Sequence, residues 1–159
     1  MKRIVAVMLL GLIAMGGGCD PGPIYGPDAP RVSVGTISDR QSWTAKGNLE
    51  DGDLAADGNI NTIAIGRAGN STSLTIDLGQ ACTFNFVVVD HGRNELGYAR
   101  QVQVATSIDG RTFTPQANCP GTRRVSNFLL NSTVLARYVR ITAVQPGANP
   151  WSVAEVYIQ

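Results

Sequence analysis

The 159-residue chain has few aromatic residues and few charges, which narrows the functions it can have. Aromatic residues make up 6% of the sequence, charged residues make up 16%, and the formal net charge is +1. No block of basic residues and no acidic tail is present, which argues against recognition of nucleic acid or of a membrane surface by charge. The pair Arg123-Arg124 is too small to change this expectation.

The motifs of common enzyme classes are also missing. The single histidine, His91, follows Asp90, but neither a Gly-x-Ser-x-Gly element nor a catalytic cysteine motif accompanies this pair. Asp90 and Glu95 could be read as a glycosidase pair, although any two carboxylates could. No phosphate-binding loop and no dinucleotide fingerprint occurs. The sequence therefore predicts a protein without catalytic residues.

The N-terminal segment has the layout of an export signal. Two basic residues precede an apolar run over residues 4–15, and three glycines precede Cys19. The apolar run is short for a membrane span. We interpret residues 1–18 as the signal peptide of a bacterial lipoprotein, whose lipid attaches to Cys19, although Gly16 stands where such signals usually have Leu. Ordinary signal cleavage with an incidental cysteine is the alternative.

The residues after the signal predict a tether and then a single exported domain. Residues 19–30 contain four prolines and two glycines, which favour an extended linker, so the domain is expected over residues 31–159. Cys82 and Cys119 remain in this domain. An oxidising compartment favours a disulfide between them, and two buried thiols are the alternative. The protein is expected in the bacterial cell envelope, held to the membrane only by its lipid anchor.

Short strands separated by turns dominate the rest of the chain. Residues 73–79 alternate, with Leu74, Ile76 and Leu78 on one face, and Asp109-Gly110 between two β-prone runs predicts a tight hairpin with positive φ at both residues. The segment 38–53 shows little periodicity and is expected to be a long loop. The remaining expected strands span residues 83–90, 100–107, 111–116, 125–131, 135–144 and 151–159. This pattern predicts an all-β, antiparallel sandwich or barrel.

The stretch AADGNINTIAIG, residues 55–66, resembles an EF-hand loop but does not match one. Asp57, Asn59 and Asn61 alternate as in that motif, but Thr62 replaces the turn glycine and Ala68 stands where the closing glutamate belongs. A turn held by Asp and Asn side chains, without metal, is one interpretation of this stretch.

Four segments in order resemble the discoidin, or coagulation factor 5/8 type C, domain family and the carbohydrate-binding modules of that fold. They are AADGNINT (55–62), LTIDLGQ (74–80), VQVATSIDGRTFTP (102–115) and ARYVRITA…PWSVAEVYI (136–158). The resemblance implies an eight-stranded jelly-roll β-sandwich over residues 31–159. It also implies a structural calcium ion, for which hard oxygen ligands suit. The implied ligands are the side chains of Asp57, Thr62 and Glu155, the Thr62 carbonyl, and the carbonyls of Ala56, Asn59 and Ala154. Ala64 departs from the family, which usually has Trp there.

The segment HGRNELGY, residues 91–98, offers the polar groups and the aromatic ring that a sugar site needs. The candidate ligand-binding residues are Trp43, His91, Arg93, Asn94 and Tyr98, whereas Trp151 is expected to pack at the rim of the core. The sequence thus predicts a non-catalytic binding module for a glycan or cell-surface polysaccharide. The alternative is a structural or adhesive subunit that binds an envelope protein.

Overall fold

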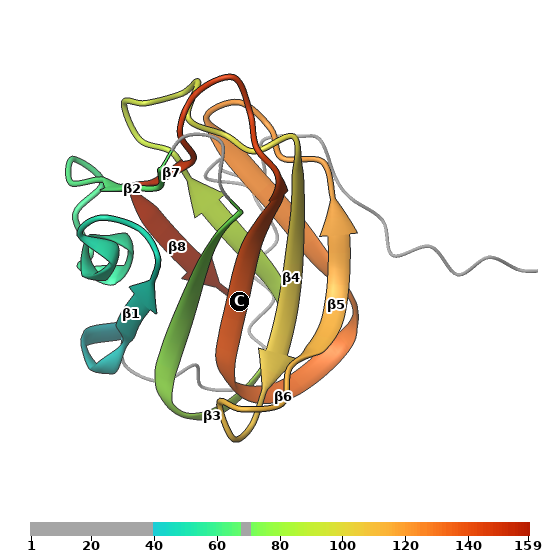
Figure 1. Ribbon diagram of the computed structural model, residues 1–159. Helices are drawn as coiled ribbons and strands as arrows, with labels where there is room; N and C mark the ends of the chain where they lie inside the picture. Colours follow the sequence, from blue (N-terminus) through green and yellow to red (C-terminus); the bar gives the residue numbers. More distant parts are fainter. Residues whose placement is uncertain (1–39, 68–70) are drawn as a thin grey trace, which may run out of the picture.

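The computed structural model describes residues 40–67 and 71–159 and shows a two-layered β-sandwich (Figure 1). The predicted signal peptide, Cys19, the linker and the start of the domain lie outside these residues. Where the structure describes the chain, no helix is both long and apolar enough to cross a membrane. The elements, in chain order, are η1 (Arg40–Ser42), β1 (Thr44–Gly47), η2 (Gly52–Ala56), β2 (Ala64–Ile65), β3 (Thr72–Asp90), β4 (Gln101–Ser107), β5 (Thr114–Cys119), β6 (Val125–Gln145), β7 (Ser152–Val153) and β8 (Glu155–Ile158).

Two long strands, β3 and β6, belong to both layers of the sandwich. The first half of β3 pairs with the second half of β6, and the second half of β3 pairs with the first half of β6. On its other edge, β3 pairs with β1 along its first half and with β8 along its second half. The strand order of the larger layer is β1-β3-β6-β4-β5. We predicted four separate strands here, but the chain bends without losing its hydrogen-bonded partner. Gly79, with φ at 78°, and a register shift between Asp77 and Cys82 mark the bend in β3.

The alternation of apolar and polar residues correctly predicted which side chains enter the core. Leu74, Ile76 and Leu78 of β3 are fully buried, and Val139 and Ile141 of β6 face them in the same core. The larger layer therefore keeps one face against the core, as antiparallel sheets often do. The expected long loop over 38–53 is wrong in part, because it contains η1, β1 and the start of η2.

The Asp109-Gly110 turn joins β4 and β5 as predicted, but its geometry differs. Gly110 has φ at 71°, whereas Asp109 does not have positive φ, and residues 108–113 separate the two strands. The Asp109 carboxylate accepts hydrogen bonds from the backbone amides of Arg111 and Thr112 at 2.9 and 3.0 Å. These bonds lower the pKa of Asp109 to about 2. A side-chain-capped turn thus replaces the predicted two-residue hairpin.

The predicted disulfide between Cys82 and Cys119 does not form. Cys82 is a thiol that contacts the carbonyl of Gln80, and it lies opposite Ala136 on β6. Cys119 pairs with Val102 of β4, and Val102 pairs in turn with Ala143 of β6. Ala143 lies seven residues beyond Ala136 along β6. Seven residues of strand span roughly 23 Å. A disulfide requires a Cα separation of about 4.4–6.8 Å, so both cysteines are placed too far apart.

Candidate functional site

Three loops meet at one end of the sandwich, at the top of Figure 1. They are residues 91–100 after β3, residues 120–124 before β6, and residues 146–151 after β6. Backbone bonds tie them together: the amide of His91 donates to Arg124 at 2.8 Å, and the amide of Ser152 donates to Gly97 at 2.8 Å. The loop after β3 therefore lies between the other two loops and is bonded to residues beside both. This agrees with the expectation that β3 ends at the rim of the sandwich.

A hollow of about 510 Å³ opens between these loops. Its lining residues are Arg93, Asn94, Glu95, Leu96, Arg123, Asn149 and Pro150. The structure thus keeps Arg93 and Asn94 of the predicted ligand set. Sequence reasoning missed Arg123, Asn149 and Pro150, because they lie on loops that become neighbours only when β6 returns to this end.

Each of the two asparagines of the hollow donates one hydrogen bond from its side-chain amide. Asn94 Nδ2 donates to Ser152 Oγ at 3.0 Å, and Asn149 Nδ2 donates to the carbonyl of Leu96 at 3.3 Å. These bonds fix the amides and leave their oxygens to accept hydrogen bonds from a ligand. Arg123 forms a salt bridge with Glu95 at 3.2 Å, so this pair presents a donor and an acceptor side by side.

His91 does not reach the hollow, which corrects its predicted role as a ligand contact. Its side chain is 0% exposed, with Nδ1 2.6 Å from the Ser152 carbonyl and Nε2 3.1 Å from Ser126 Oγ. Burial lowers the pKa of His91, against the opposing effects of the Ser152 carbonyl and of Asp90. The neutral ring therefore ties the loop after β3 to β6 and β7, and it positions Asn94 indirectly through Ser152.

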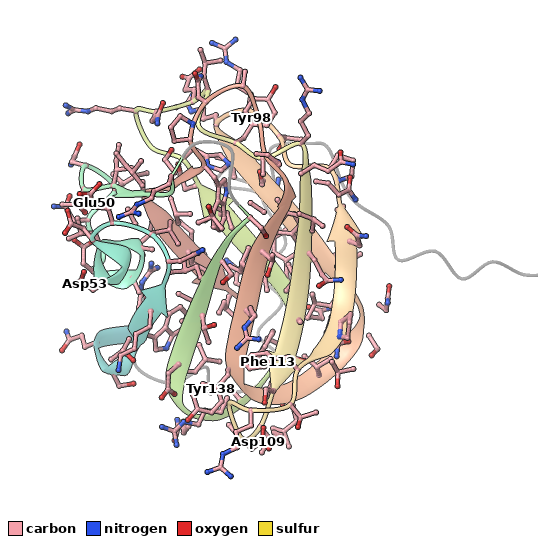
Figure 2. All side chains as sticks on the ribbon, in the orientation of Figure 1. Glu50, Asp53, Tyr98, Asp109, Phe113 and Tyr138 are labelled. Atoms are coloured by element: carbon pink, nitrogen blue, oxygen red, sulfur yellow. The ribbon has the colours of Figure 1, made fainter. Side chains whose placement is uncertain are left out.

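The aromatic candidates also fail to line the hollow. Trp43 is 8% exposed and packs in the core beside β1, with the Arg40 guanidinium 5.5 Å from its ring centroid. Trp151 is buried, as expected for a residue that packs at the rim. Tyr98 lies at the same end as the hollow, as Figure 2 shows, and it is half-buried, but it does not line the hollow.

The AADGNINT loop forms a tight cluster of oxygen atoms. The Asp57 carboxylate accepts the amide of Asn59 at 2.7 Å and the hydroxyl of Thr62 at 2.8 Å, and the same hydroxyl is 2.6 Å from the Asn59 carbonyl. These bonds account for the turn without any metal. They also gather three of the predicted ligand oxygens within one short loop.

The last strand meets this loop at Glu155. The Glu155 side chain is 1% exposed, and burial raises its pKa, while Arg40 and the backbone amide of Gly58 act in the opposite direction. Gly92, with φ at 56°, allows the contact: a Cβ there would lie 2.8 Å from the Ala154 Cβ and 2.9 Å from the Ile60 carbonyl. The sequence had paired Glu155 with this loop only through the resemblance.

The residues at this contact are compatible with calcium. Glu155 Oε1 pairs with the Arg40 guanidinium, whereas Oε2 is buried, and the nearby Gly58 amide does not reach hydrogen-bond geometry with it. An orphaned carboxylate oxygen beside the Asp57 loop is a suitable ligand for a hard cation. Across residues 40–67 and 71–159, no three acidic, histidine or cysteine side chains gather around one point, so backbone carbonyls would have to complete the shell.

Comparisons with known structures agree with this fold. The family 32 carbohydrate-binding module of NanJ from Clostridium perfringens, in complex with galactose, has a TM-score of 0.67 at 23% identity, covering 79% of this chain and 98% of that one. The module CBM32-5 of CpGH89 from the same organism, in complex with GalNAc-β-1,3-galactose, has a TM-score of 0.69 at 17% identity, covering 79% and 99%. Chitosan-binding module 1 of a chitosanase/glucanase from Paenibacillus sp. IK-5 has a TM-score of 0.65 at 21% identity, covering 74% and 95%.

The comparison of sequences is decisive for the family. A search of curated protein sequences finds no match. The F5/8 type C domain, in contrast, matches residues 35–156, which is most of the chain and includes every strand described above except the end of β8. The bent β3 and β6 strands, the Asp57 loop and the closing β8 strand are therefore those of a member of the F5/8 type C domain family.

Proposed function

We propose that this chain is a non-catalytic carbohydrate-binding module. The observation that carries the proposal is the hollow at the loop end, where fixed amides, guanidinium groups and a carboxylate face one small space. Sugar hydroxyls both donate and accept hydrogen bonds, so they need this mixture of groups. Structures of the same fold that hold galactose or GalNAc-β-1,3-galactose support the choice of ligand class.

A glycan-array screen of the full chain tests the proposal. We expect specific binding by the wild-type protein and a marked loss for Asn94→Ala, because Asn94 supplies a fixed amide to the hollow. Asn131→Ala is the matched control, since Asn131 is exposed between the two halves of β6, away from the three loops. A well-folded wild-type protein that binds no glycan would refute the proposal.

Calcium is the proposed structural cofactor, held by the Asp57 loop and by Glu155. Ligands that bind only the folded state stabilise it, by about 2.7 kcal/mol at a hundredfold excess over Kd. The melting temperature should therefore fall when a chelator removes calcium, and Asp57→Ala should abolish this difference. If calcium and chelator give the same melting temperature for the wild type, the loop is a metal-free turn.

A protein-binding role is the second candidate, and a different surface favours it. Ile108 and Leu135 are 56% and 61% exposed, and both line a hollow at the opposite end of the sandwich. Exposed apolar side chains that lie together are typical of protein contacts. A pull-down from envelope extracts with wild type and Leu135→Ser would test this role: a partner captured only by the wild type would support it.

Membrane tethering through Cys19 belongs to the same proposal. Export with a lipid anchor would place the module at the surface of an envelope membrane, where glycans are available. Metabolic labelling with a radioactive fatty acid should mark the wild-type protein and not Cys19→Ser. Equal labelling of the two proteins would exclude Cys19 as the attachment point.

A further inference from the structure

The loop end of the sandwich is basic, although the whole chain is nearly neutral. The three loops carry four arginines and one glutamate, whereas the formal net charge of the complete chain is +1. The arginines are Arg93, Arg100, Arg123 and Arg124. Acidic residues gather instead on the side of the molecule, between residues 50 and 57, as the labels of Glu50, Asp53 and Tyr98 show in Figure 2. The loop end of the molecule therefore differs in charge from this side.

Two of these arginines line the hollow, and they differ in their partners. Arg123 is neutralised by Glu95 at 3.2 Å. Salt bridges in the described parts of the chain otherwise join Arg40 to Glu155 and Arg137 to Asp77, so Arg93 takes part in none of them. Arg93 is exposed at the edge of the hollow, next to the fixed amide of Asn94. Among residues 40–67 and 71–159, therefore, Arg93 brings to the hollow a positive charge that no salt bridge neutralises.

We propose that this hollow selects sugars that bear a carboxylate, such as uronic or sialic acids, with Arg93 as the group that binds the carboxylate. The inference rests on the proposed carbohydrate binding and names its ligand class. A guanidinium group can bind a carboxylate with two parallel hydrogen bonds that are strengthened by opposite charge, whereas the hydroxyls of a neutral sugar carry no charge. The amide oxygens of Asn94 and Asn149 accept hydrogen bonds from hydroxyl groups of the same sugar, and Leu96 contacts an apolar part of the sugar ring.

The shape of the site favours a glycan over a nucleic acid. Single-stranded nucleic acids are held by aromatic side chains that stack on the bases along a basic groove. No aromatic residue lines this hollow, and its volume of about 510 Å³ is that of a small-ligand site. The four arginines of this end also lie on short separate loops and do not form a long basic stripe.

A paired glycan array tests the inference. Uronate- and sialate-bearing oligosaccharides are printed beside the same oligosaccharides after reduction of each carboxylate to a hydroxymethyl group, together with single-stranded DNA. We expect the full chain to prefer the acidic member of a pair, and this preference should weaken as sodium chloride is added. Arg93→Gln should lower affinity for the acidic member about tenfold or more, as loss of charge-assisted hydrogen bonds does. The reduced member should be little affected.

A control arginine separates local binding from overall charge. Arg111 is exposed beside the Asp109 turn, which Figure 2 shows at the opposite end from Tyr98. Arg111→Gln removes the same charge and should leave the preference intact. Equal binding to acidic and reduced members would overturn the inference while leaving carbohydrate binding standing. The inference would also be overturned if Arg93→Gln and Arg111→Gln lost the same affinity for the acidic oligosaccharides. Binding of single-stranded DNA as tightly as the acidic oligosaccharides would overturn it too. Failure to bind any glycan would refute the proposed function itself.

Discussion

Replacement of Arg40 by alanine provides the most direct test of how the Asp57 loop region is held together. The Arg40 guanidinium pairs with Glu155, donates to the Val156 carbonyl at 2.8 Å, and lies 4.5 Å from the ring centroid of Tyr157. Glu155 is 1% exposed, so Arg40→Ala leaves a buried carboxylate without its counter-charge. The variant removes these interactions from η1 and β8 at once.

The expected loss can be bounded from burial. Removal of one partner of a buried ion pair costs about 3–5 kcal/mol. The Arg40 side chain is 32% exposed, so solvent already screens part of the pair. We therefore expect Arg40→Ala to lower the free energy of unfolding by about 2–3 kcal/mol. The double variant Arg40→Ala, Glu155→Gln removes the buried charge as well and should recover much of this loss.

Urea unfolding followed by tryptophan fluorescence measures the effect, because both tryptophans are buried in the fold. The measurements use chelator at pH 7 and are then repeated with calcium. Because burial raises the folded-state pKa of Glu155 above its ordinary value, its protonation favours the folded state. The deficit of Arg40→Ala should thus shrink as the pH falls towards that raised pKa. Added calcium should reduce it too, by supplying a cation to Glu155.

One result would refute this reasoning. Surface substitutions without a structural role typically change the free energy of unfolding by about 0.5 kcal/mol or less. If the free energy of unfolding of Arg40→Ala in chelator lies that close to the wild-type value, the guanidinium does not stabilise the buried carboxylate. If Glu155→Gln fails to rescue the single variant, the loss comes from the contacts of Arg40 with Val156 and Tyr157 instead.

Three further outcomes are expected. Because burial lowers the folded-state pKa of His91, the wild type should lose stability as the pH falls below 6.5, where the unfolded chain takes up the proton; urea titrations of His91→Asn should lack this slope. Arg137→Ala should lower the free energy of unfolding at pH 7 by about 1 kcal/mol or less, because its side chain is 40% exposed and solvent screens its pair with Asp77. The Arg137 hydrogen bonds lower the pKa of Asp77, so acid titrations below 3.8 should show a smaller loss of stability for the variant than for the wild type. A Cβ at Gly97 would lie 2.0 Å from Ser152 Oγ, so Gly97→Ala should weaken both stability and glycan binding. Gly52→Ala, where the nearest atom is 3.7 Å away, is the control, and equal losses in a thermal melt would contradict this account.

The predicted site was less accurate than the predicted strands, and the difference has a physical cause. Side-chain alternation is a local property, so the buried faces of residues 73–79 and 135–144 could be read directly. The exposure of Trp43 and His91 could not be predicted in this way, because it depends on which distant parts of the chain pack against these side chains. Polar and aromatic side chains in a loop can equally well bind a ligand or fill the end of a core.

The sequence by itself determined that this chain forms an antiparallel β-sandwich, which side chains fill its core, and which family it resembles. The tertiary structure alone decided which distant residues meet. Arg40 reaches β8 across 116 positions of the sequence, and Asn94 is fixed by Ser152 across 58. These contacts follow from the bends of β3 and β6, which return the chain to the same end of the sandwich. Such bends depend on strand partners far away in the sequence, and no local pattern records them.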